Sequence, residues 1–212
     1  MIRELARGSD FWFGNHWFTD STPVPCGMSR PTVQRSTLAG WAGYGYCASH
    51  SRFFWGLRPY LVCILTGMPI MWSPANSKIG EREVLAAMLE VDADLVANRE
   101  GILLISDKGF ASKAFEKDLA RLGIQLLRPS FKREKERYGE PMLKKVRQLI
   151  ESVNDTLKGR LDLEQHGGRT IEGVAIRVAI RVAERVLAMA AGIWHDNKTG
   201  APDARPLIAF DH

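Results

Sequence analysis

The chain has 212 residues, of which 45% are hydrophobic and 25% are charged, a composition typical of a soluble globular protein with one good-sized domain. Its formal net charge is +5 and its pI is about 9.2, which suggests a polyanionic partner. No segment predicts a membrane span, because the most apolar stretch, residues 174–194, carries four charged side chains. The N-terminus lacks the apolar core of a signal peptide and the three cysteines cannot all pair, so we expect a cytoplasmic protein.

The first predicted strand, residues 16–21, carries Asp20 near its end. The stretch at about 22–56 is rich in Gly, Pro, Ser and Thr and predicts a loop-rich, irregular insertion. Its aromatic residues lie among arginines and could stack on unpaired bases, although a satellite core under a long loop is the favoured interpretation. These aromatic residues are Trp41, Tyr44, Tyr46, Phe53, Phe54 and Trp55.

The middle of the chain predicts alternating strands and helices. Two apolar runs, residues 57–67 and 69–76, predict a β-hairpin, and residues 80–92 predict an amphipathic helix with an acidic first turn. Residues 102–106 then predict a buried strand that carries Asp107 at its C-terminal end.

A second helix is predicted over residues 111–123 and a further strand at 124–128. Strands followed by alternating strands and helices predict an α/β fold, in which a mixed sheet is flanked by helices. We expect one domain over residues 1–195 and a C-terminal tail over residues 196–212.

A basic run at residues 130–141 has no apolar periodicity and predicts an exposed or mobile loop. Lys132, Arg133 and Lys135 lead toward Lys144, on a helix predicted to begin near residue 142, and could form a track for phosphate groups. A solvated loop is the alternative, with about equal weight.

The helix that follows would carry a charged stripe. At about 100° per residue, Arg147, Glu151 and Lys158 fall at roughly 0°, 40° and 20° around the helix axis. Apolar residues, among them Val146, gather about 110° away and could pack on a core. Taken alone, the stripe predicts a solvated face with an ordinary ion pair.

Three acidic side chains could meet at one edge of the predicted sheet. Asp20 and Asp107 lie at strand ends, where ligand-binding groups collect in α/β sheets, and a helix packed nearby could add Glu151. Three carboxylates repel one another unless cations lie between them, and hard oxygen ligands suit Mg²⁺ or Mn²⁺. Two such ions can hold the attacking and leaving oxygens of a phosphoryl displacement. Each aspartate alone has a structural alternative, the capping of a turn.

This combination resembles the DDE transposases of bacterial insertion sequences, which have an RNase H-like catalytic fold. In one large group of them the third acid lies in a helical signature, Tyr-x2-Arg-x3-Glu-x6-Lys. Arg147, Glu151 and Lys158 match its last three members with the correct spacing. The segments TDSTPV around Asp20 and ISDKGF around Asp107 look like the first two acid-bearing strands of the family.

The resemblance implies a catalytic domain that cleaves and joins DNA strands at the ends of an insertion sequence. It implies that Asp20, Asp107 and Glu151 bind two Mg²⁺ ions, which Mn²⁺ can replace. Arg147 and Lys158 would contact phosphate groups near the transposon end. We also expect a homodimer on DNA, associated with the nucleoid.

The resemblance spans about residues 14–195, with two departures from the family pattern. Lys144 stands where the signature has its Tyr, and only 19 residues precede Asp20, too few for the usual domain that recognises the terminal repeats. The expectation is therefore a truncated catalytic domain. Two alternatives stay open: a non-catalytic DNA-binding or inhibitory fragment, and an RNase H-like nuclease that cuts without joining.

Overall fold

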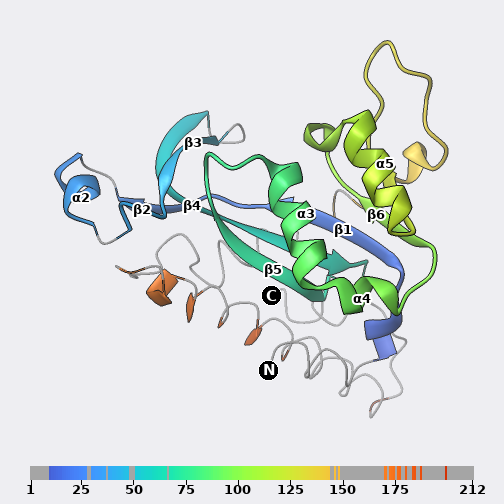
Figure 1. Ribbon diagram of the computed structural model, residues 1–212, viewed down its shortest axis with the longest axis horizontal. Coiled ribbons are helices and arrows are strands. Elements are labelled where there is room, and N and C mark those ends of the chain that lie inside the picture. The colour runs from blue at the N-terminus through green and yellow to red at the C-terminus, as the bar shows by residue number, and fades with distance from the viewer. Residues whose placement is uncertain are drawn as a thin grey trace.

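A seven-stranded mixed β-sheet forms the centre of the fold (Figure 1). The structure is a computed structural model, and it describes residues 10–27, 30–36, 38–47, 51–65, 67–143, 146, 148, 170, 172–174, 176, 177, 180, 183, 184, 187 and 199. The strands are β1 (His16–Ser21), β2 (Val24–Gly27), β3 (Gly43–Cys47), β4 (Arg52–Ile64), β5 (Pro69–Asn76), β6 (Ile102–Ile105) and β7 (Ile124–Leu127). The helices and short 3-10 turns are η1 (Asp10–Phe13), α2 (Arg30–Arg35), α3 (Glu81–Val91), α4 (Ala93–Ala97), η3 (Lys108–Phe110), α5 (Lys113–Arg121) and η4 (Glu140–Met142).

Strand β1 lies in the middle of the sheet. The order of the main strands is β5–β4–β1–β6–β7, in which β6 runs parallel to β1 and β7 parallel to β6. Strand β4 is antiparallel to both of its long neighbours, β1 and β5. The predicted mixed sheet and the predicted β4–β5 hairpin are thus confirmed.

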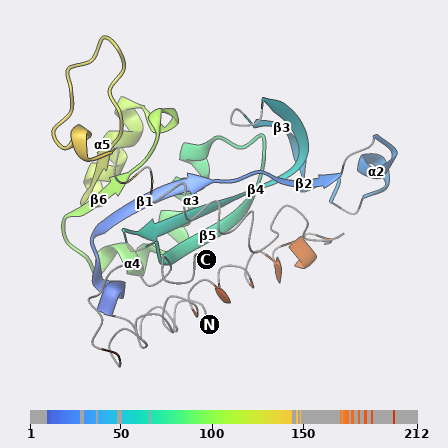
Figure 2. The same ribbon diagram turned by 180° about the vertical axis from the view of Figure 1, so that it is seen from behind.

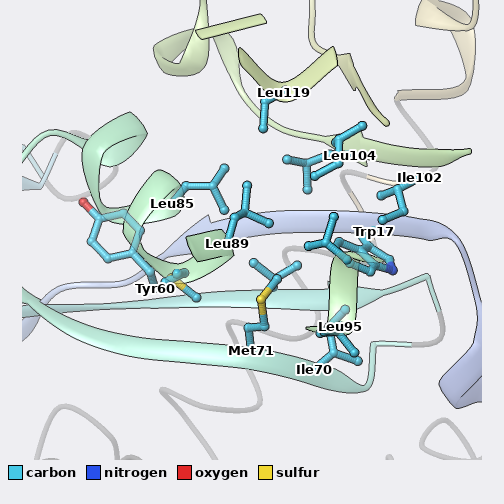
Figure 3. Close-up of a cluster of buried hydrophobic side chains, with 14 of the residues drawn as sticks. Trp17, Tyr60, Ile70, Met71, Leu85, Leu89, Leu95, Ile102, Leu104 and Leu119 are labelled. Carbon is cyan, nitrogen blue, oxygen red and sulfur yellow. The ribbon is translucent and has the colours of Figure 1, made fainter. Parts of the chain in front are cut away.

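Helices α3, α4 and α5 cover one face of the sheet and enclose the larger hydrophobic core (Figures 1 and 3). Trp17 of β1 is completely buried there, near Leu104 of β6, and Leu85 of α3 belongs to the same cluster. Burial of each side chain of this kind contributes roughly 1.5–3 kcal/mol to folding. The apolar face of α3 is what the sequence periodicity predicts, because its buried residues lie at helical spacing: Val84, Leu85, Met88 and Leu89.

A second buried cluster lies on the opposite face of the sheet. Successive side chains of a strand point to opposite faces, so Phe18 points away from the face of Trp17 and joins Leu57, Ile105 and Val146. Val146 is 9% exposed, and its backbone is helical, as are those of residues 143 and 148. The segment that precedes the predicted charged stripe therefore packs on the Phe18 face.

The stretch after β1 is more regular than predicted. Instead of a continuous irregular insertion, it contains β2, α2, β3 and the first residues of β4. Glycine-rich sequence misled the prediction here, because Gly43, Gly45 and Gly56 lie inside strands, where the chain approaches its neighbours too closely for a side chain. Figure 2 shows β2 continuing outward from β1 alongside β4.

The basic loop after β7 is held by ion pairs. The Arg128 guanidinium, only 3% exposed, contacts Glu116 of α5 at 3.1 Å and Glu134 of the loop at 2.8 Å. Arg137 also contacts Glu116, at 3.0 Å. Lys132, Arg133 and Lys135 are exposed, as predicted. No helix in the described ranges is long and apolar enough to cross a membrane.

Candidate active site

Asp20, on β1, and Asp107, two residues past the end of the adjacent parallel strand β6, occupy matching positions. In the parallel pairing of β1 with β6, Phe18 lies opposite Ile105. Asp20 follows Phe18 by two residues, and Asp107 follows Ile105 by two residues. By strand alternation, Asp20 lies on the face of Phe18, the face on which Val146 packs. The structure thus brings the first two predicted acids to one edge of the sheet.

Each aspartate also has a local backbone contact. The Ser21 amide donates a hydrogen bond to Asp20 Oδ1, and the Gly109 amide donates one to Asp107 Oδ1, each at 2.8 Å. Asp107 thereby caps the short turn η3. The capping role considered as the alternative for Asp107 is present, and it fixes one carboxylate oxygen while the side chain stays exposed.

A third carboxylate at this edge, Glu81, was not predicted. Its Oε1 accepts a hydrogen bond from the Ser21 hydroxyl at 3.2 Å and contacts the Arg58 guanidinium at 3.3 Å. Its Oε2 and Asp107 Oδ1 lie 2.9 Å and 3.0 Å from the point where a Cβ on Gly109 would be. The two oxygens are therefore no farther apart than the sum of those distances.

Burial in the fold raises the pKa of Glu81 above its ordinary value, and the charges of Asp107 and Asp20 raise it further. Arg58 and the Ser21 hydroxyl act in the opposite direction. The pKa of the nearby Tyr60 phenol is also raised, first by burial and then by the charge of Glu81. Negative charge is thus concentrated at the edge that carries the two aspartates.

The proposed metal ligands are placed only in part. Among the described residues, no group of three His, Cys, Asp or Glu side chains is arranged so that it could hold a metal ion. The third predicted ligand, Glu151, lies outside the described residues, as do the predicted DNA-contacting residues Lys144, Arg147 and Lys158. Two carboxylates with exposed or half-buried oxygens nevertheless form an oxygen donor set of the kind that Mg²⁺ prefers.

An open hollow of about 740 Å³ lies between α3 and β5, and it is not the candidate site. Its lining includes Trp41, Trp72 and Glu83 but neither Asp20 nor Asp107. The carboxylates instead lie at the edge of the sheet where β1 and β6 end.

Comparison with known proteins identifies a matching family over most of the chain. Residues 14–171 match the family model described as transposase DDE domain. No curated protein matches the chain.

Three solved structures share features of the fold at low identity. The catalytic core domain of BIV integrase is 14% identical, with 80% of this chain and 81% of that chain covered and a TM-score of 0.43. A simian T-cell lymphotropic virus intasome in complex with PP2A regulatory subunit B56 gamma is 11% identical, with 79% and 48% covered and a TM-score of 0.42. The piggyBac transposase synaptic complex with hairpin DNA is 13% identical, with 62% and 26% covered and a TM-score of 0.39.

Proposed function

Because the chain belongs to the transposase DDE domain family, we propose that it cleaves DNA at insertion-sequence ends and joins the strands, with divalent metal ions. Its mixed sheet around β1 is the RNase H-like sheet that the sequence predicts. The observation that carries the proposal is the matched position of Asp20 on β1 and Asp107 just past the end of the parallel strand β6. This placement gives two carboxylates at one edge of the sheet.

Asp20, Asp107 and Glu151 would hold two Mg²⁺ ions, or Mn²⁺ in their place. The packing of Val146 on the Phe18 face supports this set, because Glu151 follows Val146 by five residues and Asp20 shares that face. Bound ions supply a more acidic water or hydroxyl nucleophile and neutralise charge on the phosphate. Burial, and then the charges of Asp107 and Asp20, raise the pKa of Glu81, and a cation at this edge would offset the repulsion among these carboxylates.

The basic side chains would position the DNA backbone. Lys132, Arg133 and Lys135 are exposed and would contact phosphates, and we assign the same role to Lys144, Arg147 and Lys158. Arginine can bind a phosphate through two parallel hydrogen bonds, whereas lysine acts as a point charge. Joining of two ends would require two copies of the chain, so we propose a homodimer assembled on DNA, acting in the cytoplasm on the nucleoid.

The test is an assay of nicking and strand joining on a supercoiled plasmid and an end oligonucleotide, with Mg²⁺ or Mn²⁺. We expect Asp107→Asn and Glu151→Gln each to lower product formation at least about 100-fold, because each removes a charged oxygen ligand from the set that would hold the metal ions. Asp118→Asn is the matched control, since Asp118 is an exposed carboxylate on α5 paired only locally with Arg121.

Retention of activity in Asp107→Asn would contradict the proposal. Products that are cleaved but never joined would favour the alternative of an RNase H-like nuclease. Folded protein that binds DNA equally with and without metal, and never nicks it, would favour the non-catalytic fragment.

A further inference from the structure

A two-stranded arm extends beyond the candidate active site (Figures 1 and 2). The arm consists of β3 paired with residues 52–56 of β4. Strand β4 pairs with β1 at Leu61, opposite Asp20, and with β3 at Phe53, opposite Tyr46. Eight residues at about 3.3 Å each place these two points roughly 26 Å apart along one strand.

One face of the arm is aromatic, and its outer part is exposed, whereas Trp55, opposite Tyr44 on the same face, is buried. Tyr46 and Phe53 face each other across the two strands with ring centroids 5.0 Å apart, and Tyr44 lies two residues from Tyr46 on the same face. The exposed fractions are 54% for Tyr44, 48% for Tyr46 and 78% for Phe53. We call these three residues the aromatic face. Aromatic side chains at such exposure are costly to leave in water without a partner.

The other face of the arm is packed, so the arm is a fixed platform. Phe54 is buried, and a Cβ on Gly45 would lie 2.8 Å from Ser77 Cβ, in the turn between β5 and α3. Arg58 ties the arm to the candidate site, since its guanidinium donates to the Tyr46 carbonyl at 3.1 Å and contacts Glu81 at 3.3 Å. The pairing of β3 with β4 therefore holds the three rings of the aromatic face in solvent.

The sequence segment that contains the arm carries charge of one sign, although one of its arginines, Arg58, pairs with Glu81 of α3. Residues 21–80 contain no Asp or Glu and carry five basic residues: Arg30, Arg35, Arg52, Arg58 and Lys78. Removing these five from the 29 Lys and Arg of the chain leaves 24, equal to its 24 Asp and Glu, so this segment carries the entire net charge of +5. Two copies of the chain that met through this segment would repel each other, because both carry the same positive charge.

We propose that the aromatic face binds unpaired nucleotides of single-stranded DNA. Aromatic rings stack on bases only where the bases are not already stacked in a duplex, and surrounding arginines attract the phosphate backbone. This inference goes beyond the proposed function, because the binding needs no metal and no strand cleavage.

The experiment is binding of a fluorescein-labelled oligothymidylate, and of a duplex of the same length, in the presence of a chelator. Base stacking is worth about 1 kcal/mol or more per base, so we expect Phe53→Ala and Tyr46→Ala each to weaken single-strand binding at least about fivefold. Duplex binding changes less than about twofold in the same variants. Phe53→Tyr keeps single-strand binding, because it keeps a ring.

The matched controls are Phe13→Ala and Tyr138→Ala, which remove exposed aromatic rings elsewhere on the chain. Circular dichroism confirms folding, and sedimentation reports the oligomeric state. The proposal is overturned if folded wild-type protein does not bind the single strand, if the controls weaken binding as much, or if arm variants change only self-association. Because no metal is present, failure here leaves the proposed strand-transfer function testable on its own.

Discussion

At the scale of single residues, the Glu81 carboxylate links three elements of the candidate site. It contacts β1 through Ser21 and β4 through Arg58, and its second oxygen points toward the turn after β6 at Gly109. Its position at the first residue of α3 also suits the helix dipole, which favours negative charge there. These contacts make Glu81 a positioning residue for the sheet edge that carries the aspartates.

Glu81→Gln is expected to change how stability depends on pH. A carboxyl whose pKa is raised by folding contributes stability that is fully present below its unfolded pKa and is lost as pH rises through the folded value. Relative to Glu81→Gln, the wild type should therefore lose stability as pH rises above 4.5, the ordinary pKa of the group. Thermal unfolding across this range measures the difference, with the exposed Glu83→Gln as control. If the wild type instead becomes more stable relative to Glu81→Gln as pH rises, the ion pair with Arg58 outweighs the cost of burying the Glu81 carboxylate.

Gly109→Ala is expected to disturb the site with little effect on folding. The new methyl group would lie about 3 Å from both Glu81 Oε2 and Asp107 Oδ1 and would push the two carboxylates apart. Since both atoms end flexible side chains, the loss of stability should stay below about 1 kcal/mol. We expect a severalfold higher Mn²⁺ concentration at half-saturation, measured by calorimetry. Unchanged metal binding would show that these oxygens do not face the ions.

At the scale of elements, Arg128 joins α5 to the loop after β7. Arg128→Met is expected to lower the free energy of unfolding by about 1–3 kcal/mol, because Glu116 and Glu134 lose the nearly buried guanidinium that pairs with them, although both carboxylates can still be hydrated. Hydrogen bonds from Arg128 and then from the Phe131 amide lower the pKa of Glu134 from 4.5 to about 2, so the stability that Arg128 contributes through Glu134 is present above pH 4.5 and is lost as pH falls toward 2. The difference in free energy of unfolding between the wild type and Arg128→Met should therefore become smaller as pH falls from 4.5 toward 2. Urea unfolding at several pH values measures it, and Arg121→Met is the exposed control.

Elements with clear periodicity were predictable from the sequence, and elements defined by their partners were not. The apolar runs of β4 and β6 and the amphipathic pattern of α3 indicate their structures directly. Strand β3, with sequence GYGYC, forms because a long β4 offers it a pairing edge, which no local pattern reveals. Asp20 and Asp107 were predictable because each ends a strand, whereas Glu81 looks like any acidic residue at the start of a helix.

At the scale of the whole molecule, charge is distributed unevenly, with the net positive charge in residues 21–80 and an exposed basic loop at the far side of the sheet. Duplex binding through phosphate contacts should weaken with salt by a log–log slope of about −0.9 per contact. Neutralising Lys132, Arg133 and Lys135 to Gln should make that slope shallower by about 2–3. Fluorescence anisotropy over a salt series measures it, and Lys113→Gln with Lys117→Gln on α5 is the control. If the slope does not change, these three side chains do not contact the phosphate groups of the DNA.

The central place of β1 has a consequence for how the chain folds during synthesis. The first long strand to leave the ribosome pairs on one side with β4 and on the other with β6, so its second edge stays open until residue 105 has been made. Contacts between segments so distant in sequence form slowly, and an unpaired central edge is a site for mispairing with other chains. Asp20 and Asp107 can therefore meet only after residue 107 has been made, which makes the edge that carries them one of the last parts of the sheet to be completed on the ribosome.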